Sequence, residues 1–324
     1  MTDMSSTEAV MAVLGATSGR TVPRAHLSRE PVDFSTRKPR RNKTSERNCD
    51  SDSEEAQSVP GMAAGRHRRI ALAAATTLLF AACLAMAVTS SAAVAAMGEI
   101  PMPGGWAMSA MWLPMCGQTW TGTALSFLGM WTPMMTAMML PSLAPVLRHY
   151  GQTLRQDGET RPEGSIILAG LGYFCVWTAI GGGLFPFGAA LATAAIREPA
   201  LAHAFPVAAA AVVLGAGALQ FTAWKARRLA DCRAVPARGH AVPEGAFAAL
   251  RLGLRHGCHC AGACAGPTAV LVVFGMANLP LMAAVAVAVT AERLAPKGEC
   301  VAHAVGAVLV GAGAFLVARL AGIG

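Results

Sequence analysis

Six long apolar segments occupy most of the chain beyond residue 69 and leave few soluble folds open to it. They run from about 70 to 94, 123 to 147, 165 to 191, 201 to 224, 261 to 290 and 301 to 320. Each is long enough, at about 1.5 Å per helical residue, to cross about 30 Å of hydrocarbon. Only 14% of the 324 residues are charged, against about a quarter in a soluble domain. The pattern predicts an all-α, polytopic transmembrane helical bundle of about six spans over residues 66–324.

The segment before the first span has a different composition. Residues 1–65 are rich in Ser, Thr, Arg, Pro and acidic residues, with no apolar periodicity. Such a segment cannot bury enough apolar area to offset the entropy lost on ordering, so we expect a disordered cytoplasmic tail. The small residues Ala93-Val94-Ala95 would suit cleavage of a signal peptide. The length of the apolar region and its long polar preamble favour a retained span instead.

Lys and Arg are concentrated in alternate loops. Three arginines precede the first span, and the loops 148–164 and 225–260 together carry ten Lys and Arg residues. The loop 98–122 carries none. The positive-inside rule therefore predicts that both termini lie in the cytoplasm, and the expected location is the cell inner (cytoplasmic) membrane. Because these charges flank apolar spans, we interpret them as orientation signals and expect no nucleic-acid partner.

Cysteine and histidine are densest at the start of the fifth segment, where residues 256–264 read HGCHCAGAC. Thiolate and imidazole groups suit Cu(I), Zn(II) or an iron–sulfur centre; we favour Cu(I), with Zn(II) as the next alternative. Positions four apart share a helical face, so His256, Cys260 and Cys264 form the expected core of a metal site.

Three further residues are candidates around that core. Cys258 and His259 project elsewhere on a helix and join the site if residues 256–259 are still a loop. Cys232 follows the fourth segment and is a weaker candidate from the same side of the membrane. A single cysteine is more often a small apolar core residue than a ligand, and only the density of donors favours metal binding.

Methionine is concentrated earlier in the chain, since ten of its 17 copies lie between Met97 and Met139. Thioethers favour Cu(I), but methionine also fills irregular apolar gaps. Inside the second segment we favour packing. In the predicted extracytoplasmic loop, where there is little core to fill, the two roles are equally supported. The weaker ligand candidates of this loop are Met102, Met108, Met111, Met115 and Cys116.

Asn278 and Pro280 lie inside the fifth segment, which is longer than one span requires. Proline removes a helical hydrogen bond, so we expect a kink or break there. A buried amide in hydrocarbon needs a partner, so we expect Asn278 to tie helices together. The chain has no phosphate loop, nucleophile elbow or zinc-protease helix, which leaves hydrolases and nucleotide-driven pumps unsupported.

Two blocks of sequence resemble a bacterial family of predicted metal-binding integral membrane proteins of unknown function. One is residues 130–145, MWTPMMTAMMLPSLAP; the other runs from Gly253 through Cys260 and Cys264 to Asn278 and the ERLAP sequence at 292–296. Gln220, Lys225 and Cys232 match a weaker block. The resemblance covers about residues 100–322 and implies metal binding, with copper handling a frequent supposition. Where family members often have adjacent cysteines, this chain has Ala263-Cys264.

We interpret the sequence as a membrane protein that binds a soft metal ion for handling or transfer. Its expected partners are the lipid bilayer, the metal ion and a protein that delivers or accepts the metal. Two other classes stay open. One is a membrane thiol oxidoreductase using Cys258, Cys260 and Cys264, which lacks a C-x-x-C pair. The other is a non-catalytic assembly subunit whose cysteines only pack.

Overall fold

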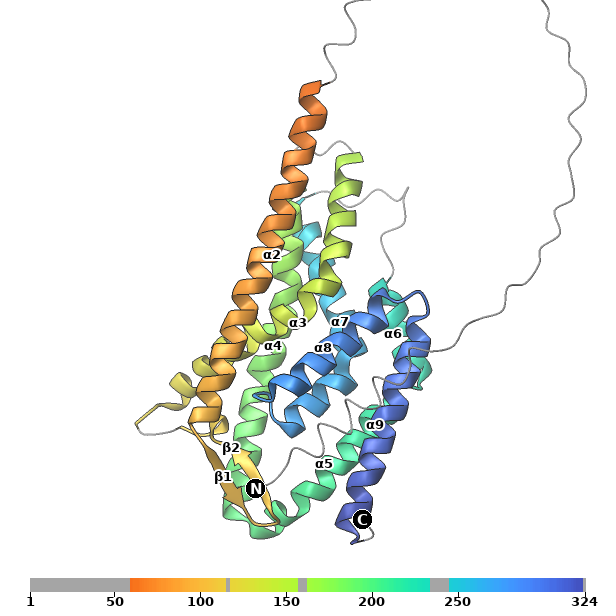
Figure 1. Cartoon of the computed structure of the whole chain (residues 1–324). Coiled ribbons are helices and arrows are strands. Elements are labelled where there is room, and N and C mark those ends of the chain that lie inside the picture. The colour runs from red at the N-terminus through yellow and green to blue at the C-terminus, as the bar shows by residue number, and fades with distance from the viewer. Residues whose placement is uncertain (1–58, 115–116, 157–161, 234–244, 323–324) are drawn as a thin grey trace, which may run out of the picture.

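The computed structural model describes residues 59–114, 117–156, 162–233 and 245–322. Within these ranges the chain forms a bundle of long helices with one small β-hairpin, which confirms the all-α fold (Figure 1). The predicted tail lies almost wholly outside the described residues. The first described helix begins at Val59, inside the last part of the segment assigned to that tail.

The described residues form eight α-helices. They are α2 (Val59–Ala96), α3 (Trp120–Gln156), α4 (Pro162–Arg197), α5 (Pro199–Leu219), α6 (Ala223–Arg233), α7 (Ala246–Phe274), α8 (Leu279–Leu294) and α9 (Gly298–Leu320). Between α2 and α3, strands β1 (Glu99–Met102) and β2 (Trp106–Ser109) pair antiparallel, with Glu99 opposite Ser109. A 3₁₀ turn, Ala110–Trp112, follows β2.

Five of the described helices are long and apolar enough to cross a membrane, which supports a polytopic membrane protein. They are α2 from Ile70, α4, α5, α7 and α9. The predicted second segment lies within α3, which is not one of the five. Three prolines interrupt α3, at Pro133, Pro141 and Pro145, and its interior face is the most methionine-rich surface of the bundle.

Helix lengths fix the depth of the centre of α7. With 21 and 23 residues, α5 and α9 are about 32 and 35 Å long, which fits one crossing of about 30 Å. Lys225, just beyond the end of α5, donates to the backbone carbonyl of Ala263 in α7. The middle of α7 therefore lies level with the end of α5, and the first half of α7 extends beyond that level.

The predicted fifth segment is two helices. α7 ends at Phe274, and Gly275 has φ +96°, a conformation that residues with a side chain rarely adopt. Asn278 does not tie helices together as expected; its side chain accepts a hydrogen bond from the Leu281 backbone N–H at 3.0 Å and so caps α8. α7 also begins at Ala246 rather than near Ala261, so the Cys/His cluster lies mid-helix.

α8 returns toward the end of the bundle from which α7 descends, and α9 then runs antiparallel to α5. Gln220, at the end of α5, reaches Glu292 near the end of α8. Gly217 of α5 lies against Val310 of α9, and Gly306 against Gln220. As a result, α2 begins at one end of the bundle and α9 ends at the other (Figure 1).

α4 and α7 approach closely through small residues. A Cβ added to Gly253 would overlap the backbone carbonyl of Ala169, and one on Gly172 would meet the backbone of Leu250. This contact brings the centre of α7 against Tyr173 of α4, and it depends on glycine at the crossing.

We predict that Gly253→Ala lowers the stability of the folded protein by about 1–3 kcal/mol, because backbone atoms cannot move aside as a flexible side chain could. Unfolding in detergent, followed by circular dichroism, measures the loss. Gly183→Ala is the matched control, since a Cβ there meets nothing within 4 Å and alanine favours helix. Equal losses in the two variants would contradict the packing argument.

Candidate functional site

Cys260 and Cys264 lie one helical turn apart on the buried face of α7, as their spacing predicts. Their exposed fractions are 0% and 1%. Both sulfurs contact the same nitrogen of one guanidinium group: Arg293 Nη2 is 2.5 Å from Cys260 Sγ and 3.3 Å from Cys264 Sγ. Arg293 comes from the last turn of α8. The two thiol sulfurs therefore converge on one point, and the cationic guanidinium group of Arg293 lies there.

Two more groups contact Cys260 from other helices. The Tyr173 hydroxyl, on α4, lies 2.8 Å from Cys260 Sγ, and the Met139 thioether, on α3, lies 3.9 Å from it. Both side chains are 0% exposed. The site is thus a junction of α3, α4, α7 and α8, and two thiols and a thioether are its soft donors.

The charge of Arg293 needs a counter-ion. A guanidinium stays protonated in proteins, and an unpaired charge in a buried site is strongly unfavourable. Its Nη1 donates to Ser142 Oγ at 2.8 Å, and Nε has no partner in the described part of the chain. The neighbouring carboxylate, Glu292, is already paired with Lys225. Charge balance therefore favours one thiolate between Cys260 and Cys264.

A buried ion pair, Lys225–Glu292, lies next to the site. Lys225 Nζ lies 2.7 Å from Glu292 Oε2, both side chains are 2% exposed, and Gln220 Nε2 donates to Glu292 Oε1 at 3.1 Å. Lys225 also donates to the Ala263 carbonyl. That carbonyl lacks its helical donor because residue 267 is proline, which has no N–H. Lys225 replaces this missing bond in the turn that contains Cys264.

The other members of the Cys/His cluster do not join the two thiols. His256 packs against Tyr173, with ring centroids 5.8 Å apart. His259 Nδ1 lies 3.1 Å from Asp231 Oδ2 and 3.3 Å from Arg228 Nη1, which turns it toward α6. Cys258 is exposed. Cys232 is buried in the same core, where burial raises the pKa of its thiol to about 12.

A cavity of about 330 Å³ lies next to this region, lined by α3, α4 and the first half of α7, with one residue from α6. Tyr173, His256 and His259 line it, together with Asp231 and Arg255. Because the Tyr173 hydroxyl contacts Cys260, the wall of the cavity is one side chain away from the thiols. The two histidines therefore face an approach to the site rather than the site itself.

The methionines of the predicted loop pack in apolar surroundings. Met102 and Met108 lie in a small core with Ala192, Ala195 and Ala202. Met111 belongs to the main core. Met115 and Cys116 lie outside the described residues. The hairpin closes over the turn between α4 and α5, where Trp106 Nε1 donates to the Ala202 carbonyl at 2.8 Å.

In the described ranges no three His, Cys, Asp or Glu side chains form a metal-binding group. The soft donors that converge include a methionine, and the groups that complete the site are Met139, Tyr173 and Arg293. Sequence reasoning assigned Met139 to packing and gave Tyr173 and Arg293 no role. The one available signal was that Met139 and Arg293 lie in the two blocks that carry the family resemblance.

Comparison with known proteins gives one match. A family model described as "PpoB2: Copper chaperone" matches residues 128–316. The matched region contains both thiols and every group that contacts them. No curated protein and no solved structure matches the chain.

Proposed function

The chain belongs to the PpoB2 copper chaperone family, and on this basis we propose that it is a membrane-embedded Cu(I) chaperone whose ion is held by Cys260 and Cys264. The observation that carries the proposal is the shared contact of both sulfurs with Arg293 Nη2. A cation placed between the sulfurs would meet two thiolates, and the Met139 thioether is the nearest third donor. Thiolates and thioethers select Cu(I).

These side chains match the ligand set of Zn(II) less well than that of Cu(I). A structural zinc site takes four Cys, His or carboxylate ligands in a tetrahedron. Here two thiols are joined by a thioether, a phenol and a guanidinium. Cu(I) bound by two thiolates carries one net negative charge, which Arg293 would balance. The site therefore suits a monovalent soft ion.

The distribution of charge supports a cytoplasmic approach to the site, with the inner membrane as the location. Arg227 and Arg228 lie on α6, and Arg251 and Arg255 lie on the first half of α7, where Arg255 lines the cavity that leads to Tyr173. By the positive-inside rule this end faces the cytoplasm. A protein that delivers or accepts copper would dock there. The end of α9 then lies on the opposite side, unlike the sequence expectation for the C-terminus.

The burial of the thiols disfavours a thiol oxidoreductase. Disulfide exchange requires a second sulfur to attack along the bond being broken, and neither Cys260 nor Cys264 is accessible to a partner protein. A role in packing alone also explains the two cysteines poorly. Cysteines that only fill space would gain nothing from a buried arginine, whose desolvation opposes folding.

The test is the copper content of a Cys260→Ala/Cys264→Ala variant purified in detergent and loaded with Cu(I) under anaerobic conditions. We expect it to lose the ion that the unaltered protein retains. Cys258→Ala is the matched control, because Cys258 is on the same helix but exposed, and it should keep its copper. Equal copper in the double variant and the unaltered protein, by elemental analysis, would refute the proposal. A single Cys264→Ser change provides the same test with a smaller disturbance.

A further inference from the structure

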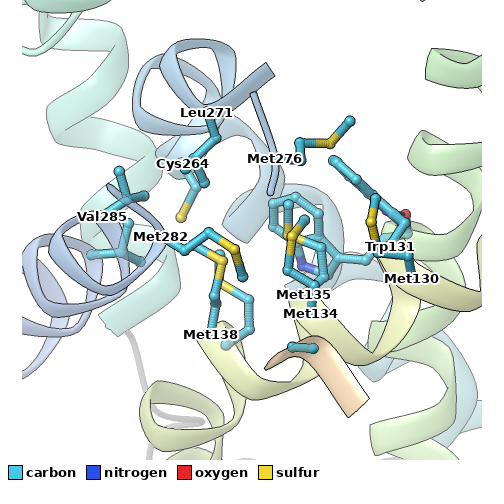
Figure 2. Packing of buried hydrophobic residues seen from close by; sticks show 14 of the residues in the cluster. Met130, Trp131, Met134, Met135, Met138, Cys264, Leu271, Met276, Met282 and Val285 are labelled. Atoms are coloured by element: carbon cyan, nitrogen blue, oxygen red, sulfur yellow. Dashed lines mark hydrogen bonds between the residues drawn. The ribbon is translucent and has the colours of Figure 1, made fainter. Parts of the chain in front are cut away.

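The core around the two thiols is unusually rich in sulfur. Of the 23 buried residues in the main cluster of the described chain, eight are methionine and three are cysteine. Five of the methionines come from α3, at positions 130, 134, 135, 138 and 139, and Met276 and Met282 come from the α7–α8 hairpin (Figure 2). An ordinary apolar core is built mainly from Leu, Ile and Val.

Three of these methionines border space that is not filled. Met134, Met138 and Met282 line a cavity of about 510 Å³ between α2, α3 and α8. The exposed fractions of the three side chains are 1%, 5% and 6%. Methionine that serves as a filler closes gaps, whereas these three are among the side chains that line one. Met134 and Met138 pack in the main core as expected, and their position on the cavity wall adds to that packing role.

This cavity offers few kinds of metal ligand. Apart from Thr290, the side chains that line it are apolar, so its only good metal donors are thioether sulfurs. Thioethers are neutral and soft, they need no deprotonation, and they favour Cu(I) over Zn(II) or Mg²⁺. We propose that Met134, Met138 and Met282 form a second Cu(I) site, distinct from the Cys260/Cys264 pair.

The two sites are neighbours in the bundle. The Cys264 sulfur points toward Met282 and Met138 (Figure 2). Met138 adjoins Met139, whose thioether contacts Cys260. Met134 and Met138 share a face of α3 because they are four residues apart, and Met282 is placed opposite by the break at Gly275 that turns α8 back. The second site therefore extends the proposed function from one bound ion to two.

The experiment counts ions on the full chain in detergent. The protein is titrated with Cu(I), and in parallel with Ag(I), then freed of unbound metal by gel filtration and measured by elemental analysis. A Met134→Leu/Met138→Leu/Met282→Leu variant preserves volume while removing the sulfurs, and it should bind one ion fewer than the unaltered protein. Met102→Leu/Met108→Leu, in the hairpin core, is the matched control and should bind the full number.

The Cys260→Ala/Cys264→Ala variant separates the two proposals. It should retain the ion of the methionine site, and its copper X-ray absorption should show thioether sulfur as the ligand. Equal ion counts in the triple-leucine variant and the unaltered protein would overturn the second site, with the dithiol proposal intact. If the Cys variant binds no ion at all, the second site is likewise absent. Retained binding at the dithiol shows that the triple variant is folded.

Discussion

Replacing Lys225 with methionine should lower the stability of this protein by about 3–5 kcal/mol, the range seen when one partner of a buried ion pair is removed. The Glu292 carboxylate would stay buried with Gln220 as its remaining partner. The Ala263 carbonyl would also lose its donor, because Pro267 cannot supply one. Denaturant unfolding in detergent measures the change.

Two variants check the reason for that loss. Lys225→Met/Glu292→Leu removes both charges and should recover most of the stability, since replacing a whole buried pair with apolar residues is often neutral. Arg155→Met breaks a pair at 3.2 Å whose side chains are 31% and 34% exposed, and it should cost less than about 1 kcal/mol. Similar losses for Lys225→Met and Arg155→Met would show that the buried pair is not special.

Replacing Arg293 with leucine should weaken Cu(I) binding about a hundredfold or more. A copper ion held by two thiolates carries a net negative charge, and without Arg293 that charge would be buried and uncompensated. Breaking a buried charge pair costs about 3–5 kcal/mol, and about 1.4 kcal/mol corresponds to a tenfold change in Kd. Competition with a Cu(I) chelator of known affinity gives the value.

The design of this test uses two more arginine changes. Arg227→Leu removes an exposed charge on α6 and should leave copper affinity unchanged. Arg293→Lys keeps the charge but cannot contact Ser142 and both sulfurs in the same planar geometry, so its affinity should be intermediate. Unchanged affinity in Arg293→Leu would mean that the guanidinium does not balance the bound ion.

Local spacing was enough to predict part of this site. Cys260 and Cys264 share a helical face wherever the helix lies, so their convergence follows from the sequence. His256 shares that face too, but it lies one turn away against Tyr173 and the cavity. Periodicity gives the direction of a side chain, and it does not say which neighbouring helix packs at that height.

The remaining contacts depend on tertiary packing. Arg293 reaches the thiols because α8 turns back after Gly275, and Tyr173 does so because glycines let α4 approach α7. Asn278 and Pro280 indicated the break, but its consequence for Arg293 could not be read from them. The apolar pattern also missed the first half of α7, because Arg251 and Arg255 lower hydropathy without interrupting a helix.

The proline in α7 makes one turn of that helix depend on α6. Pro267 has no N–H to donate to the Ala263 carbonyl, so the turn that contains Cys264 takes this bond from Lys225, a residue of another element. The position of Cys264 is therefore set partly from outside α7. A protein that docks on α6 and shifts Lys225 would move Cys264 relative to Cys260 without touching either cysteine.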